Sequence, residues 1–269
     1  MEKARLTKRQ LAKRLGISVS SMYYQHIRPV VDEEVKNQIE TVLTDNPAYG
    51  HKRLALALKL NKKRILRVMK KYNIKPYKRR TKKFVKKADL GKKPAIFPNL
   101  LKDTRPLKPD EIWTTDFTYI RYKNKFIYLA TVLDLFTREI VGVNVSRFHT
   151  KELVLGALED ALTRYSLPKV IHSDQGSEYD SEAYISFCEK LGIAISMSEK
   201  GSPWQNGYQE SFYSNFKLEL ADSGRFNDIG ELVEEILRLV WYHNNMRIHT
   251  ALKTSPFKYR ESYYRKLGT

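Results

Sequence analysis

Residues 111–146 read EIWTTDFTYIRYKNKFIYLATVLDLFTREIVGVNVS, and this stretch decides which fold the sequence predicts. It contains three runs rich in β-branched and aromatic residues, separated by the turn-like segments around Tyr122–Lys125 and Phe136–Arg138. Connections this short join antiparallel neighbours, because parallel strands need a longer crossover. The stretch therefore predicts three antiparallel strands in one sheet.

The residues that follow extend this sheet with alternating helices and strands. The predicted elements are a helix over 150–165, the strand KVIH at 169–172, a helix over about 180–191, the strand IAISM at 193–197 and a long helix from about 228 to 244. Antiparallel strands followed by this alternation are typical of an α/β sheet of the ribonuclease H type. We expect residues 109–269 to form such a domain, a mixed five-stranded sheet flanked by helices and ending in a C-terminal helix.

The net charge of the chain is distributed unevenly. The 269 residues include 49 Lys and Arg against 30 Asp and Glu, a formal net charge of +19. Residues 1–100 hold 27 basic and 7 acidic side chains, whereas residues 101–269 hold 22 basic and 23 acidic ones. A basic part next to a nearly neutral one indicates a polyanionic partner, nucleic acid in preference to an acidic membrane.

Several classes of protein are excluded by the composition. No window approaches 18 consecutive apolar residues, so no transmembrane helix is predicted. The first residues have no apolar core of a secretion signal. The single cysteine, Cys188, allows neither an internal disulfide nor a cysteine-rich zinc site. We therefore expect an intracellular protein with no membrane partner.

The N-terminal part is predicted to be all-α. Residues 1–30 contain a small helix-turn-helix-like segment, in which Gly16 can make the turn and Ser18 or Ser20 can cap a second short helix. Residues 31–76 form a clearer unit, with a helix over 33–45, the segment HKRLALALKL after Gly50, and a final helix capped by Asn61.

The final helix of this unit combines an apolar stripe with basic faces. Its apolar residues recur at helical spacing from Ile65 to Tyr72, and cations occupy the remaining positions. A tight turn before such a helix predicts a helix-turn-helix DNA-binding domain whose second helix enters the major groove; a solvated basic helix on a small bundle is the alternative. The expected DNA contacts are Lys62, Lys63, Arg64 and Arg67.

Basic residues continue past this helix. Residues 61–93 contain 16 Lys and Arg against one acid, Asp89, and residues 75–93 show neither helical nor strand periodicity. We expect residues 77–108 to be a basic linker that follows DNA phosphates, with Arg79 and Arg80 among its contacts.

Three acids stand out by their setting. Asp116 lies within the predicted strand WTTDFTY, where Asp is unusual. Asp174 directly follows the apolar strand KVIHS, and ligands gather at the carboxyl ends of parallel strands. Glu210 lies near the start of a predicted helix, behind the loop EKGSPWQNG. Two Asp from neighbouring strands and a Glu from a facing helix can bind two divalent cations, and oxygen-only ligands select Mg²⁺ or Mn²⁺.

Together these segments resemble a known family. WTTDFTYI, VLDLFTREIVG, IHSDQGSEY and SMSEKGSPWQNGYQESFYSNFKLEL resemble the catalytic core of DDE transposases and retroviral integrases, closest to OrfB-type transposases of the insertion-sequence-three family. The 35 residues between Asp174 and Glu210, and Lys217 seven residues after the Glu, match the family pattern. The closing YHNNMRIHTALKTSPFKYR and the segment Tyr49–Arg53 also resemble family signatures, so the resemblance covers about residues 33–260.

The resemblance implies site residues and a cofactor. Asp116, Asp174 and Glu210 would be catalytic ligands of two Mg²⁺ ions, with Mn²⁺ as a substitute, and Lys217 would hold terminal DNA. The loop differs from the common family pattern at Gln205, so Gln205 and Asn206 are expected as DNA contacts only, with helix capping by Asn206 as the alternative. Glu178 is expected to be solvated.

The resemblance also implies a function. The chain would be a DNA transposase that binds the terminal inverted repeats of an insertion sequence, cleaves DNA and transfers the free 3′ end to target DNA. Homo-oligomers would assemble on double-stranded DNA, an upstream-frame partner protein would be possible, and the protein would lie in the bacterial cytoplasm with the nucleoid. A catalytically inactive DNA-binding regulator and a structure-specific nuclease of the same fold are the alternatives.

Overall fold

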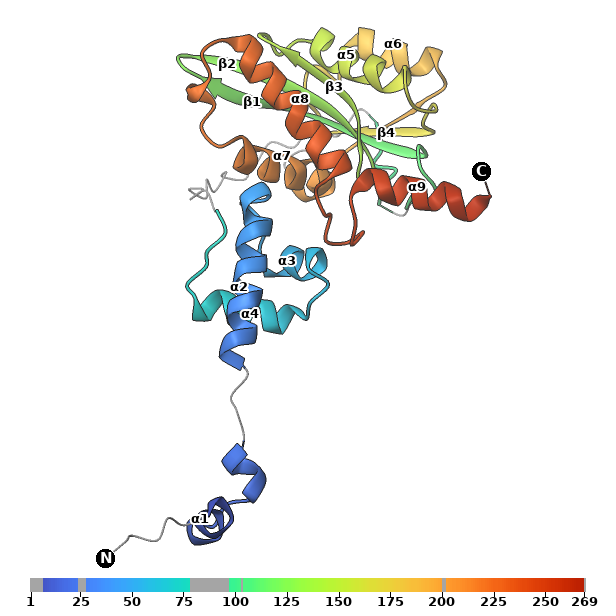
Figure 1. Ribbon diagram of the computed structural model, residues 1–269. Helices are drawn as coiled ribbons and strands as arrows, with labels where there is room; N and C mark the ends of the chain where they lie inside the picture. Colours follow the sequence, from blue (N-terminus) through green and yellow to red (C-terminus); the bar gives the residue numbers. More distant parts are fainter. Residues whose placement is uncertain (1–6, 24–27, 78–96, 103, 200–201, 269) are drawn as a thin grey trace, which may run out of the picture. The chain divides into compact units, whose positions relative to one another are not determined.

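The three β-rich runs form the strands β1 (Ile112–Tyr122), β2 (Lys125–Asp134) and β3 (Ile140–Ser146). Figure 1 shows them in the computed structural model, which describes residues 7–23, 28–77, 97–102, 104–199 and 202–268. β1 pairs antiparallel with β2, with Asp116 opposite Thr131, and β2 pairs antiparallel with β3. The prediction of three antiparallel neighbours is confirmed.

Two short parallel strands complete the sheet. β4 (Val170–Ser173) pairs with β1, and β5 (Ala194–Met197) pairs with β4, so the order is β3-β2-β1-β4-β5. Within the described residues the sheet is thus mixed and five-stranded, as predicted. β4 pairs with β1 only over Ile112–Thr114, so the part of β1 that carries Asp116 extends past the end of β4.

Helices cover both faces of the sheet (Figure 1). α5 (Lys151–Leu162) and α6 (Glu182–Lys190) pack on one face, whose core includes Trp113, Val132 and Cys188. The turn η2 (Pro203–Asn206), α7 (Gly207–Leu220), η3 (Ser223–Arg225) and α8 (Ile229–Asn245) follow, and α7 and α8 pack on the other face. α9 (Pro256–Leu267) ends the described chain.

Close packing of α5 on the sheet requires a glycine in β3. A Cβ atom on Gly142 would lie 2.1 Å from the carbonyl oxygen of Ala157 and 2.8 Å from Cβ of Ala161. Contacts this short do not occur between real atoms, so any side chain here would push α5 away from the sheet.

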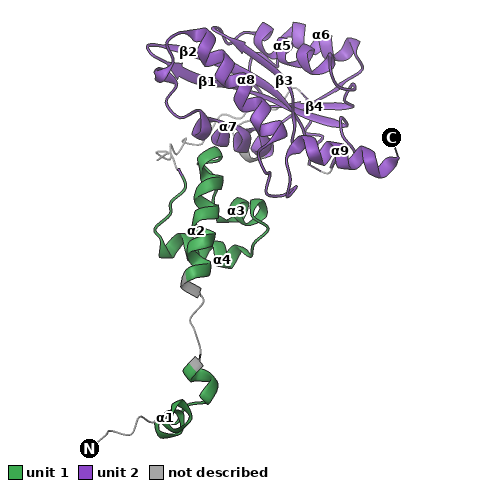
Figure 2. Ribbon diagram, viewed as in Figure 1, with its two compact units in different colours: residues 1–76 green, residues 77–269 purple. Residues whose placement is uncertain are grey.

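The chain divides into two compact units, residues 1–76 and 77–269 (Figure 2). The described part of the first contains α1 (Lys8–Leu15), the 3₁₀ turn η1 (Val19–Tyr23), α2 (Arg28–Asp45), α3 (His51–Ala57) and α4 (Lys62–Lys71). Gly16 adopts the left-handed conformation that ends α1, as predicted, and Ser18 accepts a hydrogen bond from the backbone N–H of Ser21. None of the described helices is long and apolar enough to cross a membrane.

The predicted linker extends too far toward the C-terminus. Residues 97–102, assigned to a linker over 77–108, pack on the catalytic unit: the carbonyl of Pro98 accepts a hydrogen bond from Met197 of β5, and the amide of Leu100 donates to the hydroxyl of Ser196. Phe97 and Leu101 contact the core on the two faces of the sheet. The prediction followed the run of basic residues, and this short apolar segment after it docks against the edge strand. The basic part over 78–96, with Arg79 and Arg80, lies outside the described residues.

Candidate active site

Asp116 lies on β1 where this strand extends past β4. Its side chain is half-buried, and its Oδ1 accepts a hydrogen bond of 2.8 Å from the backbone N–H of Phe117. Burial and, next, the negative charge of Asp174 raise the pKa of Asp116 to about 7, with Glu210 acting in the same direction. A carboxyl group whose pKa is raised by burial and by neighbouring carboxylates is typical of a functional site, for example one that binds a cation.

Asp174 and Glu210 reach the same region from two other elements. Asp174 is exposed directly after β4, and its Oδ1 accepts a hydrogen bond of 2.9 Å from the N–H of Gly176, which fixes the turn after the strand. Glu210 is exposed in the first turn of α7, where the helix dipole favours a negative charge. The structure thus places both predicted acids near enough to Asp116 for their charges to act on it.

The three acids do not form a closed cage. Within the described residues, no group of three or more His, Cys, Asp or Glu side chains is arranged so that it could hold one metal ion. The three side chains nevertheless offer only carboxylate oxygens. Such ligands suit hard divalent cations, which can keep part of their water shell.

Gln209, next to Glu210, fixes α7 against the sheet. This fully buried amide donates from Nε2 to the carbonyl of Thr114 at 2.7 Å and accepts from the hydroxyl of Thr131 at 2.9 Å. The hydroxyl of Tyr213, one turn later, donates to the carbonyl of Asp116 at 2.6 Å. Neither positioning residue was among those predicted from the sequence. The sequence did contain a signal for Gln209. It falls at helical spacing with Phe212, Tyr213, Phe216 and Leu220, so it occupies the buried face of α7.

The loop before α7 differs from the prediction. Asn206 is 5% exposed, and its Nδ2 donates to the carbonyl of Thr115, so it is directed into the fold; the expectation that it contacts DNA is contradicted. Its side chain makes no capping hydrogen bond either. Half-buried Gln205 uses its Oε1 to accept from the N–H of Glu199 and from Nδ2 of Asn99, so this oxygen shapes the loop. Local sequence could not show the contacts with Thr115 and Asn99, because these partners lie 91 and 106 positions away.

Glu178 is also buried, contrary to the expectation that it is solvated. Its side chain is 8% exposed and lies with one oxygen 3.0 Å from Nδ1 of His149, while the other accepts from the hydroxyl of Ser177. His149 and Ser177 hold the pKa of Glu178 below its usual value against the opposing effect of burial. This contact connects the loop after β4 to the loop between β3 and α5.

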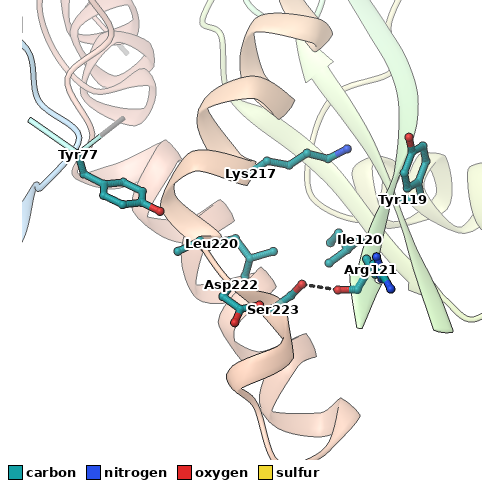
Figure 3. A pocket seen from close by; sticks show the side chains of 9 residues that line it. Tyr77, Tyr119, Ile120, Arg121, Lys217, Leu220, Asp222 and Ser223 are labelled. Atoms are coloured by element: carbon teal, nitrogen blue, oxygen red, sulfur yellow. Dashed lines mark hydrogen bonds between the residues drawn. The ribbon is translucent and has the colours of Figure 1, made fainter. Parts of the chain in front are cut away.

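Lys217 extends from α7 toward β1, as Figure 3 shows. Its Nζ lies 4.7 Å from the centre of the Tyr119 ring, and its charge acts on Asp116 in the direction that favours the carboxylate. Lys217 thus lies close to the acidic cluster, which is the setting that a lysine holding a DNA end would need.

The predicted DNA contacts of α4 fall into two groups. Lys62 and Lys63 are exposed in its first turn and Arg64 is half-buried. Arg67 instead donates two hydrogen bonds of 2.7 and 2.6 Å to Asp32, which also contacts Lys71 at 3.0 Å. These two cations hold the pKa of Asp32 well below its usual range. Arg67 therefore joins α4 to α2, a role that the prediction of a DNA contact did not include.

Buried arginines attach the C-terminal segment to the catalytic unit. Arg247, 2% exposed, donates to Glu219 at 2.5 Å and to Asn215 at 2.7 Å, both on α7. Arg260 of α9 donates two hydrogen bonds to Asp110 and one to Glu139. The segment that closes the sequence signature therefore stabilises α7, which carries Glu210, and the residues just before β1 and β3.

Comparison with known proteins places this geometry in a family. Two models described as Integrase core domain match residues 106–203 and 191–256, which together contain all three acids. A Shigella sonnei protein, the insertion element IS600 uncharacterized 31 kDa protein, is 32% identical over 93% of this chain and 97% of its own length. The chain belongs to the insertion-sequence transposase family.

Further similarities agree with this assignment. The putative transposase InsK for insertion sequence element IS150 of Escherichia coli (strain K12) is 29% identical over 91% of this chain and 90% of its own length. Among solved structures, the simian T-cell lymphotropic virus intasome in complex with PP2A regulatory subunit B56 gamma aligns with a TM-score of 0.51 and 17% identity, over 82% of this chain and 74% of that one. This structural likeness concerns the fold alone and confirms the predicted ribonuclease H-like, integrase-type core.

Proposed function

We propose that this chain is the transposase of an insertion sequence, a DDE-type polynucleotidyl transferase that cuts DNA at the ends of the element and joins them to target DNA. The observation that carries the proposal is the convergence of Asp116, Asp174 and Glu210 from β1, the end of β4 and the first turn of α7. Family membership and the integrase-core matches support the same class of reaction.

The three carboxylates fit divalent cations, and we assign them to two Mg²⁺ ions, with Mn²⁺ as a substitute. Mg²⁺ prefers oxygen ligands and takes one or two protein carboxylates while keeping several waters, so it does not require a closed cage. Positive charge beside Asp116 would oppose the burial and repulsion that raise its pKa to about 7 and would keep it ionised. When bound, such ions would activate the attacking water or 3′ hydroxyl and stabilise the leaving oxygen.

Other residues of the chain position the reactants. Gln209 and Tyr213 hold α7 on β1, which keeps Glu210 near Asp116. Lys217 binds a phosphate or base of the DNA end beside the acids. Residues 1–76 bind the terminal inverted repeats, with Lys62 and Lys63 exposed on α4 for phosphate contacts. Oligomers of the chain assemble on the two repeats, with an upstream-frame partner protein as a possible addition.

A joining reaction tests this proposal. The full chain is incubated with Mg²⁺ and a labelled, pre-cleaved terminal-repeat end, and the expected result is labelled DNA joined to a second strand. Asp174→Asn should bind the end normally and join nothing, whereas the matched control Asp180→Asn, an exposed acid on the same loop, should do both. A structure-specific nuclease would cut without joining, and a DNA-binding regulator would only bind. Absence of joined products from the wild-type protein at every concentration would contradict the proposal.

A further inference from the structure

The outer half of the β1–β2 hairpin exposes large aromatic side chains. Strand alternation places Phe117, Tyr119 and Arg121 on one face of β1, and the pairing register sets Tyr128 opposite Tyr119 and Phe126 opposite Arg121. Tyr119 and Phe126 are 59% and 49% exposed. Adjacent exposed rings on a rigid sheet indicate a binding surface.

These rings lie on neighbouring strand positions, and we call them the aromatic strip: Phe117, Tyr119, Phe126, Tyr128 and His149. Tyr119 and Phe126 meet edge to face with ring centres 5.5 Å apart. His149 lies 4.9 Å from the Tyr128 ring and, nearly parallel, 6.3 Å from the Phe117 ring. Phe117 directly follows Asp116 in β1, so the two side chains point to opposite faces of the strand. The aromatic strip is linked to the active site through Lys217, which lies beside the Tyr119 ring and whose charge acts on Asp116.

Basic side chains border the aromatic strip. Nζ of Lys217 lies 4.7 Å from the centre of the Tyr119 ring, and Figure 3 shows Lys217, Tyr119 and Arg121 around one hollow. Arg121 is exposed on the same face as Tyr119. Residues 117–131 and 143–151, which supply the aromatic strip, contain no acid. Among the described residues, Glu178 contacts the aromatic strip through His149, and Asp116 accepts a hydrogen bond from the backbone N–H of Phe117. The occupant should therefore carry negative charge together with flat apolar faces.

We propose that the aromatic strip binds an unpaired strand of DNA, with bases stacked on Tyr119 and Phe126 and phosphates on Lys217 and Arg121. Aromatic rings interleaved with cations are the general means of binding single strands. Bases in a duplex are stacked on each other and offer no free face to a protein ring, so exposed rings favour a single strand. This inference rests on the proposed function, because it places that strand beside Asp116.

Fluorescence anisotropy tests the inference without catalysis. The full chain is titrated, in EDTA, into a labelled short oligothymidylate and into the same strand paired with oligodeoxyadenylate. Tyr119→Ala and Phe126→Ala should each weaken single-strand binding by about tenfold or more, while duplex binding should not change. Tyr119→Phe, which keeps the ring, should bind like the wild type. Trp241→Ala, which removes a ring on α8 that is 57% exposed, is the matched control and should have no effect.

Photocrosslinking provides a second readout, since the basic N-terminal unit also contributes to binding. An oligothymidylate that carries 5-iodouracil should crosslink to peptides containing Tyr119 or Phe126. Crosslinks confined to other segments, or unchanged single-strand affinity in both alanine variants, would overturn the inference. Loss in Tyr119→Phe equal to that in Tyr119→Ala would exclude stacking. A changed oligomeric state by light scattering with unchanged DNA affinity would assign the strip to a protein interface instead. Neither readout depends on metal, so failure of strand transfer would leave this result interpretable.

Discussion

Arg260 on α9 neutralises buried acids, so its replacement should strongly destabilise the catalytic unit. It donates hydrogen bonds of 2.6 and 3.0 Å to Asp110 and one of 2.5 Å to Glu139, and it is 8% exposed. Burial raises the pKa of Glu139, and the charge of Arg260 opposes that shift. In Arg260→Met these carboxyl groups would remain buried without their cation.

The expected loss follows from this burial. Removing one partner of a buried ion pair costs about 3–5 kcal/mol, because the other charge is left uncompensated. For a unit of this size that corresponds to a melting temperature lower by about 6–20 °C. The loss should be larger at pH 8 than at pH 5. Without the arginine the pKa of Glu139 rises further in the folded state, and an acid with a raised folded pKa loses stability as the pH rises.

Urea unfolding followed by tryptophan fluorescence measures this loss. Arg265→Met, an exposed arginine in the last turn of the same helix, is the matched control and should change the free energy of unfolding by less than about 0.5 kcal/mol. Adding Glu139→Gln to Arg260→Met should recover about 1–3 kcal/mol, because it removes a buried uncompensated charge. Equal stability of Arg260→Met and Arg265→Met, or a loss independent of pH, would show that Arg260 does not compensate buried negative charge.

Three further predictions concern packing, pH and DNA binding. Gly142→Ala should lower the free energy of unfolding, measured by urea titration, by about 1–3 kcal/mol, because the new Cβ would lie 2.1 Å from the carbonyl oxygen of Ala157. Gly207→Ala, which places its Cβ in open space, is the control and should leave the free energy of unfolding unchanged. Asp32→Asn should lower the melting temperature, followed by helical circular dichroism, at pH 6. The difference from the wild type should shrink as the pH falls below about 4, because a carboxyl group with a lowered folded pKa stabilises the fold only when it is ionised. An equal difference at pH 6 and below pH 4 would contradict this. Lys63→Gln should reduce the salt dependence of repeat-DNA binding by about one phosphate contact without changing stability, as measured by anisotropy at several salt concentrations.

Local patterns in the sequence predicted much of the catalytic unit. Alternation in residues 111–146 located three strands, and the apolar run before Asp174 located β4. Asp116 was recognisable because Asp is unusual inside a strand, and Asp174 because ligands gather at the carboxyl ends of parallel strands. The helical pattern around Glu210 predicted its place at the start of α7.

Long-range ion pairs could not be predicted in the same way. Arg260 resembles any surface cation on an amphipathic helix, and its partners Asp110 and Glu139 lie 150 and 121 positions away. The sequence likewise does not show whether Arg67 is free to contact DNA, because its ion-pair partner Asp32 lies on another helix. A charge run shows how many cations a helix carries, but only the packing shows which of them are paired inside the fold.

In the proposed function, Asp116, Asp174 and Glu210 act as one catalytic unit in DNA strand transfer. The most direct measurement is the rate of joining of a pre-cleaved end in Mg²⁺ by the wild type, by Asp116→Asn, Asp174→Asn and Glu210→Gln, and by the triple variant. Residues that act as a unit give strongly non-additive effects, so each single variant should lose almost all joining activity and the triple variant should be no slower than the singles. Substantial joining by any single variant, or losses that multiply in the triple variant, would contradict the account.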